Sequence, residues 1–223
     1  MDRQQLFTEV ASDINRLDKA DRMPGWLASA EFLINETLRD DRMVKHSVLP
    51  ITERNFPVPP NFLEAQGELQ IREGADPSLP GKVLASLRYM SATEVADGWG
   101  EPDPWDPPRG PYWYTVRGRE YQLAGWNFDR AYLVDLYYFG TLDTLPNDNS
   151  SNWLLTAAPH IYKEGMKHFA YIHLEEPEMA DRALGNMTGA ISLLNNNTEK
   201  RKTPQGPLIR RAVRGFGANV RRR

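Results

Sequence analysis

The chain has 223 residues, 40% of them hydrophobic, which is enough for one sizeable core with extensions or for two small domains. It contains no cysteine, so disulfides, thiol catalysis and thiolate metal sites are excluded. The N-terminus is polar and no apolar run reaches the length of a membrane span. We therefore expect a soluble protein made in a cytosol, with neither a signal peptide nor a membrane anchor.

Charge is distributed unevenly along the chain. Residues 199–223 contain nine Lys or Arg and one Glu, a net charge of +8. Because the whole chain carries −3, residues 1–198 carry −11. The sequence thus predicts an acidic body with a basic tail.

Two helices are predicted near the N-terminus. Apolar residues recur at spacings of three and four over residues 5–19, and again from Trp26 to about Arg39. Pro24 and the glycine after it interrupt the pattern between them.

From residue 46 to residue 142 the pattern changes to strands and turns. Seven short segments are rich in β-branched or aromatic residues. They are 46–51, 54–58, 67–72, 82–87, 112–117, 119–123 and 131–139. The last segment is apolar almost throughout, which indicates burial on both faces or at an interface. After the fourth, Ser91 and Glu94 have the spacing of a capping box that begins a short helix.

Residues 97–111 contain five Pro, three Gly and two Trp, so no regular element is expected there. Trp99 and Trp105 favour an exposed loop that contacts a tail protein or a neighbouring subunit. Three acids of the loop, beside the two tryptophans, leave a glycan- or peptidoglycan-acting enzyme as an alternative. They are Glu101, Asp103 and Asp106. We favour a solvated docking loop, because catalytic acids must be held on rigid elements.

Residues 147–194 are the most informative segment. Four residues from Asn149 to Asn152 can offer side-chain oxygens to the free amides of a helix start, and Pro159 suits a first helical turn. We predict a short helical turn at 152–155, a main helix over about 158–174 and another helix from Pro177. The apolar face of the main helix consists of Ile161, Tyr162, Gly165, Met166, Phe169, Ala170 and His173. That of the last helix consists of Ala180, Ala183, Leu184, Met187, Ile191 and Leu194.

No motif for catalysis or metal binding stands out. His160, His168 and His173 lie on or near one helix, but the last two are five residues apart and point to different faces. The chain has no HExxH, GxSxG, P-loop or GxGxxG motif. We expect no catalytic residue, no metal and no cofactor.

The run from Asp148 to Leu155, followed by Ala158 and Pro159, resembles the head-to-tail adaptor (connector) proteins of tailed phages. A second match begins at Trp26, in the pattern WLxxAExxIN. The resemblance covers about residues 24–196. The residues that carry it, as a core or interface motif, are Asp148, Asn149, Asn152, Trp153, Leu154, Leu155 and Trp26.

The resemblance implies a virion structural protein of the neck between capsid and tail, and not an enzyme. Such proteins form a homo-oligomeric ring, usually twelvefold, that joins the portal protein to a tail nozzle or tail-tube protein. Genomic double-stranded DNA passes through the channel of the ring during ejection. An acidic body suits that channel, because a basic lining would bind phosphates.

Together, these observations predict an α+β subunit. Residues 1–45 and 148–198 would form an antiparallel helical bundle, the adaptor core. Residues 46–147 would form a β-rich insertion, and residues 199–223 an extended basic arm.

The arm combines cations with apolar residues. The set is Leu208, Ile209, Arg210, Arg211, Val213, Arg214, Phe216, Arg221, Arg222 and Arg223. Its cations suit a phosphate backbone, so a nucleic-acid-binding protein is an alternative, and a solvated tail without a role is another. Its apolar residues favour a partner protein, and several are spaced for a short amphipathic helix that forms on binding. The resemblance implies that this partner is the portal.

Overall fold

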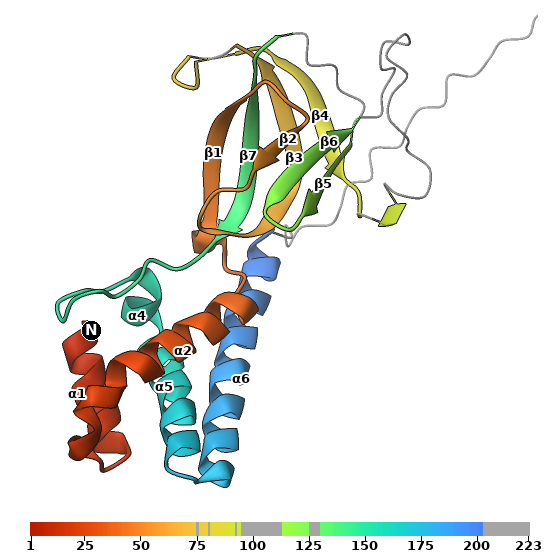
Figure 1. Cartoon of the computed structure of the whole chain (residues 1–223). Helices are drawn as coiled ribbons and strands as arrows, with labels where there is room; N and C mark the ends of the chain where they lie inside the picture. Colours follow the sequence, from red (N-terminus) through yellow and green to blue (C-terminus); the bar gives the residue numbers. More distant parts are fainter. Residues whose placement is uncertain (75, 80, 92, 95–112, 125–129, 203–223) are drawn as a thin grey trace, which may run out of the picture.

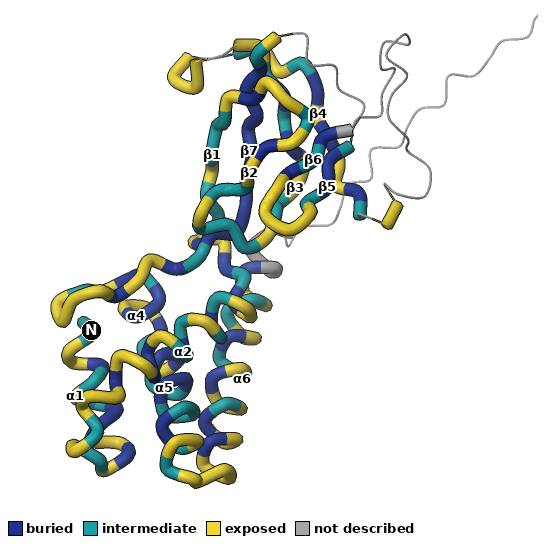
Figure 2. The backbone as a smooth tube through the Cα atoms, in the orientation of Figure 1, coloured by how far each residue is buried: buried dark blue, intermediate teal, exposed yellow. Residues whose placement is uncertain are grey.

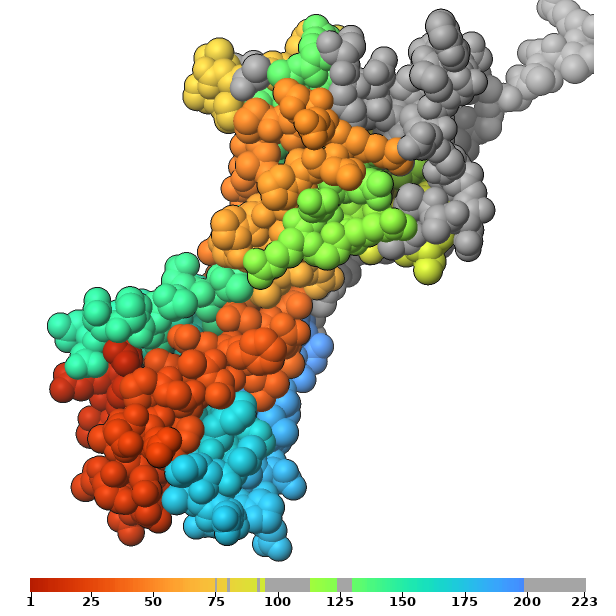
Figure 3. All heavy atoms as spheres, in the orientation of Figure 1, coloured from red at the N-terminus to blue at the C-terminus, as the bar shows by residue number. Residues whose placement is uncertain are grey.

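The computed structural model describes residues 1–202, except for residues 75, 80, 92, 95–112 and 125–129. The described chain forms two lobes that meet at a narrow waist (Figures 1 and 3). One lobe is helical and comes from both ends of the described chain, and the other is a curled sheet from the middle. The predicted α+β class is confirmed.

The helical lobe contains α-helices and short 3₁₀ turns. The α-helices are α1 (Arg3–Asp13), α2 (Met23–Thr37), α4 (Trp153–Ala157), α5 (Pro159–His173) and α6 (Pro177–Lys202). The 3₁₀ turns are η1 (Leu17–Arg22) and η2 (Asp41–Met43). Since α6 runs to Lys202, a helix occupies the first four residues of the predicted arm.

The first helix differs from the prediction at both ends. It begins at Arg3 because Asp2 and Gln5 form a reciprocal capping box. It ends at Asp13, well before the predicted residue 19, because Asn15 adopts a left-handed φ of 53° that a helix cannot continue through.

Helices from both ends of the chain bury one shared apolar core. Among its members are Leu6 of α1, Ala30 of α2, Tyr162 of α5 and Met187 of α6, and buried stripes run along these helices in Figure 2. α5 and α6 follow one another through a short turn and pack as a hairpin, whereas α2 lies obliquely to them (Figure 1). An antiparallel alignment of the whole bundle stays a prediction.

The sheet lobe has seven described strands, and each of the seven predicted segments overlaps one of them. They are β1 (Val44–Ile51), β2 (Asn55–Pro57), β3 (Phe62–Glu73), β4 (Val83–Tyr89), β5 (Trp113–Arg117), β6 (Glu120–Ala124) and β7 (Tyr132–Gly140). Their order is β1-β7-β3-β4-β5-β6-β2. Neighbours are antiparallel except β4 and β5, which run parallel.

β7 lies between β1 and β3 and connects the two lobes. Its side chains alternate between faces, so Val134, Leu136 and Tyr138 belong to the core of the sheet lobe while Phe139 belongs to the helical core. The predicted burial on both faces is confirmed, with Tyr137 as the exposed exception.

All described strands lie between Val44 and Gly140, and α1, α2, α4, α5 and α6 lie before and after them. The domain boundaries given above stay a prediction. Within the described ranges, no helix is long and apolar enough to cross a membrane.

Gly165 of α5 lies against both α2 and α6, and it provides a test of the shared core. A Cβ there would lie 3.0 Å from Met187 Sδ on α6 and 3.1 Å from Ala30 Cβ on α2. We expect Gly165→Leu to lower the free energy of unfolding by about 1–3 kcal/mol, because the added atoms have no space. Urea denaturation followed by circular dichroism measures it.

Gly185 of α6 is the matched control, because it is exposed and a Cβ there meets nothing within 4 Å. Gly185→Leu should leave stability unchanged or raise it by about 0.5–1 kcal/mol through helix propensity. Equal effects at the two positions would contradict the packing described here.

Candidate functional site

Asn152 organises the segment that resembles the adaptor family. It is the N-cap of α4, where its Oδ1 accepts a hydrogen bond from Leu155 N at 2.9 Å. Its Nδ2 donates to the Asp143 carbonyl at 2.9 Å and to Tyr162 Oη at 2.8 Å. The residue is only 7% exposed, so one side chain ties α4, α5 and the segment after β7 together.

The same segment receives the N-terminus of the chain. Arg3 N donates to the Ser150 carbonyl at 3.0 Å and Gln4 N to the Asp148 carbonyl at 2.9 Å. These are amides of the first turn of α1, which have no partner within their own helix. Ser151 Oγ in turn donates to the Met1 carbonyl at 2.9 Å. The segment therefore fixes the start of α1.

Most of the predicted core or interface residues lie inside the subunit. Leu154 and Leu155 are fully buried, and Trp26 is buried in the helical core beside the ring of His173. Trp153 is half-buried beneath the guanidinium of Arg42, whose Cζ lies 3.8 Å from the ring centroid.

The remaining motif residues, Asp148 and Asn149, are exposed, and Asp148 forms a long ion pair of 3.5 Å with Arg3. Whether the motif also serves a subunit interface stays a prediction. Trp99, Trp105 and the predicted arm residues from Leu208 to Arg223 lie outside the described residues.

A polar network at the waist was not found from the sequence. Asp40 is 3% exposed and accepts three hydrogen bonds from Arg42, from its backbone N at 3.0 Å, Nε at 2.7 Å and Nη2 at 2.9 Å. Thr198 Oγ1 of α6 donates to Asp40 Oδ2 at 3.3 Å. Asn195 of α6 accepts from Arg39 N at 2.9 Å and donates to the Thr37 carbonyl at 3.1 Å.

Arg39 extends this network to the sheet lobe. Its Nε donates to Glu64 of β3 at 2.8 Å, and its Nη1 donates to the carbonyls of Asn35 and Leu38, each at 2.8 Å. Its guanidinium also lies over the ring of Phe139. The run RDDR at residues 39–42 is visible in the sequence, but its partners on α6 are more than 150 residues away.

Asp135 of β7 is the most deeply buried carboxylate described, at 1% exposed. One carboxylate oxygen contacts His46 Nε2 of β1 and the other contacts Arg72 Nη2 of β3. Because each oxygen faces a group of a neighbouring strand, the cluster ties β1, β7 and β3 together. It shows no arrangement of nucleophile and base.

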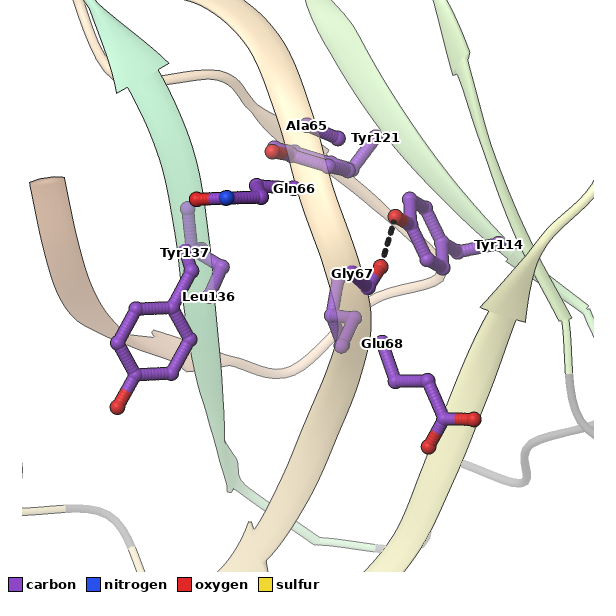
Figure 4. A pocket seen from close by; sticks show the side chains of 9 residues that line it. Ala65, Gln66, Gly67, Glu68, Tyr114, Tyr121, Leu136 and Tyr137 are labelled. Carbon is purple, nitrogen blue, oxygen red and sulfur yellow. Dashed lines mark hydrogen bonds between the residues drawn. The ribbon is translucent and has the colours of Figure 1, made fainter. Parts of the chain in front are cut away.

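The sheet lobe contains a small hollow between its strands. The hollow in Figure 4 is lined by β3, β5, β6 and β7, and Tyr114 Oη donates to the Gly67 carbonyl across it at 2.7 Å. It has essentially no space for a water molecule.

His168 Nδ1 donates to the Ala180 carbonyl at 2.9 Å and so joins α5 to α6. In the described part of the chain, no three His, Asp or Glu side chains gather as metal ligands.

In the geometry described above, the motif around Asn152 holds the fold together and the last turns of α6 are anchored at the waist. The model of the SU10 adaptor protein family matches residues 1–211, and the chain belongs to this family. It is therefore a phage structural adaptor, a virion component that binds other phage structural proteins. A comparison with curated proteins found no match.

The Asn152 site makes a direct prediction. Asn152→Ala removes the cap and leaves the Tyr162 hydroxyl and the Asp143 carbonyl without their partner, so we expect a loss of about 1–3 kcal/mol in the free energy of unfolding. Asn149→Ala, at an exposed position three residues earlier, should stay within about 0.5 kcal/mol of wild type. Thermal and urea denaturation measure both, and similar losses would argue against the role of Asn152.

The buried Asp40 at the waist leads to a second prediction, which concerns the stability of the protein at low pH. Burial disfavours the charged form of Asp40, but its bonds to Arg42 and Thr198 outweigh burial and lower the pKa of the carboxyl below its usual value. A lowered folded pKa stabilises the protein above the unfolded pKa of about 3.9, and that contribution is lost as pH falls through the folded pKa.

We therefore expect wild type to exceed Asp40→Asn in stability by a constant margin above about pH 5 and by a shrinking margin towards pH 3. Urea midpoints between pH 7 and pH 3 measure the margin. Asp21→Asn, at an exposed position, is the control. A margin that does not change with pH would show that the charge of Asp40 contributes nothing.

Proposed function

We propose that this adaptor forms a closed ring between the portal and the tail in the neck of the virion, with twelve copies to match the portal. Each subunit would use two unlike surfaces, so that the contact closes by rotation. The observation that carries the proposal is the match of the SU10 adaptor protein family to residues 1–211. The role is structural, without catalysis or a cofactor.

The arm is the proposed contact with the portal. Residues 199–223 carry +8 and mix arginines with residues such as Ile209, Val213 and Phe216, a composition suited to a groove on a protein with acidic walls. The other side of the ring would meet a tail nozzle or tail-tube protein, for which the loop at 97–111 is the proposed contact.

The ring would continue the DNA channel of the portal. Residues 1–198 carry −11, and an acidic wall lets DNA slide because it offers phosphates no counter-charge. The rival function, nucleic-acid binding, rests on the same arm, since nine cations in 25 residues would also neutralise phosphates. The glycan-acting alternative requires Asp103 or Asp106 as a catalytic acid.

Removal of residues 199–223 tests the proposal. We expect the truncated chain to remain a folded, soluble monomer that no longer binds the portal ring of the same phage. Electron microscopy and co-sedimentation with the portal measure binding, and circular dichroism checks the fold. Unchanged binding would overturn the role of the arm.

Two further assays separate the rivals. Strong DNA binding by the full chain that falls steeply with salt and vanishes on truncation would favour nucleic-acid binding. Hydrolysis of peptidoglycan that is lost in Asp103→Asn would favour the enzyme.

A further inference from the structure

The root of the arm is fastened to the rest of the subunit by two side chains of α6. Asn195 binds the Arg39 amide and the Thr37 carbonyl, and Thr198 binds the carboxylate of Asp40. All three partners belong to the segment that leaves α2 and enters the sheet lobe. The bonds are thus made at the waist, one to two helical turns before α6 ends at Lys202.

These bonds come from one face of the helix, because Asn195 and Thr198 are three residues apart. Asn195 is followed by Asn196 and Asn197, which have the same side chain and are both exposed. Thr198 is 1% exposed, although the helix around it is polar. The apolar stripe of α6 ends at Leu194, so beyond that residue hydrogen bonds take over from apolar packing in holding the helix.

The partners of Asn195 also explain why an amide is required. α2 ends at Thr37, and the carbonyls of its last turn lack partners within the helix. The side-chain amide supplies a donor to the Thr37 carbonyl and an acceptor to the Arg39 N–H at the same time. Arg39 is itself bound to Glu64 of β3, so the root of the arm is held relative to both lobes.

We propose that Asn195 and Thr198 are positioning residues that aim the C-terminal arm at the portal by fixing the last turns of α6 against the waist. This inference rests on the proposed function of the arm. A chain segment whose root can move loses orientational freedom when it binds, and a fixed root removes part of that entropic cost beforehand. Neither residue needs to touch the portal.

The test uses the full chain with Asn195→Ala and Thr198→Val, which removes all three bonds. The second change keeps the shape of the side chain, and Asp40 keeps its bonds to Arg42. We expect the affinity for the portal ring to fall about tenfold. The matched control, Asn196→Ala with Asn197→Ala, makes two changes on exposed positions of the same turn and should bind like wild type.

A distance measurement separates positioning from a general loss of stability. Because the chain has no cysteine, Lys202→Cys at the end of α6 and Arg119→Cys on the sheet lobe can carry two spin labels at unique positions. We expect the distance distribution between the labels to broaden in the variant lacking the three bonds and to stay narrow in the control. Circular dichroism should show the same helix content in both.

Each result decides the inference. A broader distribution together with weaker portal binding supports it. If the Asn195→Ala, Thr198→Val variant has the same distance distribution or the same portal affinity as the control, the positioning role is wrong. This holds even when removal of residues 199–223 abolishes portal binding. If truncation leaves portal binding intact, the proposed function of the arm itself fails, and the distance measurement then reports only on α6.

Discussion

The packing of α2 against α5 is the contact on which the rest of the structure depends. Ala30 and Gly165 face each other there, and they bring together helices that are more than 100 residues apart in the chain. Once these helices share a core, the chain between them must leave and return at the same end of the helical lobe. The sheet lobe is therefore attached through a waist, and the end of α6 reaches the same place.

At the waist, some backbone N–H and C=O groups have no partner in a helix or strand. The side chains of three asparagines form hydrogen bonds with these groups. Asn35 accepts from Leu142 N at 2.9 Å, Asn152 donates to the Asp143 carbonyl, and Asn195 bridges Arg39 and Thr37. An amide side chain carries both a donor and an acceptor, so it can replace a backbone group where the chain follows no helix or strand. Asn35 lies in α2, Asn152 caps α4 and Asn195 lies in α6, so these hydrogen bonds connect several helices to the waist.

Local signals in the sequence predicted much of this fold. The apolar stripes of α5 and α6, the seven strands and the Ser91–Glu94 capping box follow from spacing alone. The end of α1 was missed because the left-handed turn at Asn15 leaves no mark in an apolar pattern. The strand order and the waist were missed because their partners are distant in sequence, as for Asp40 and Thr198. Asn152 was one of four predicted cap residues, and the structure shows that it is the N-cap, but its bond to Tyr162 needs the packed helices.

Consecutive residues of β7 show how the two lobes are coupled. Tyr138 faces the core of the sheet lobe and Phe139 the helical core, so a single strand enters both. The Arg39 guanidinium lies over the ring of Phe139, and the Arg39 amide donates a hydrogen bond to Asn195. Arg39 therefore connects β7 to the end of α6. Packed cores resist continuous deformation, and a force on one lobe is therefore passed to the other through β7. In the ring that we propose, this coupling would let the subunit hold its partners at a fixed separation.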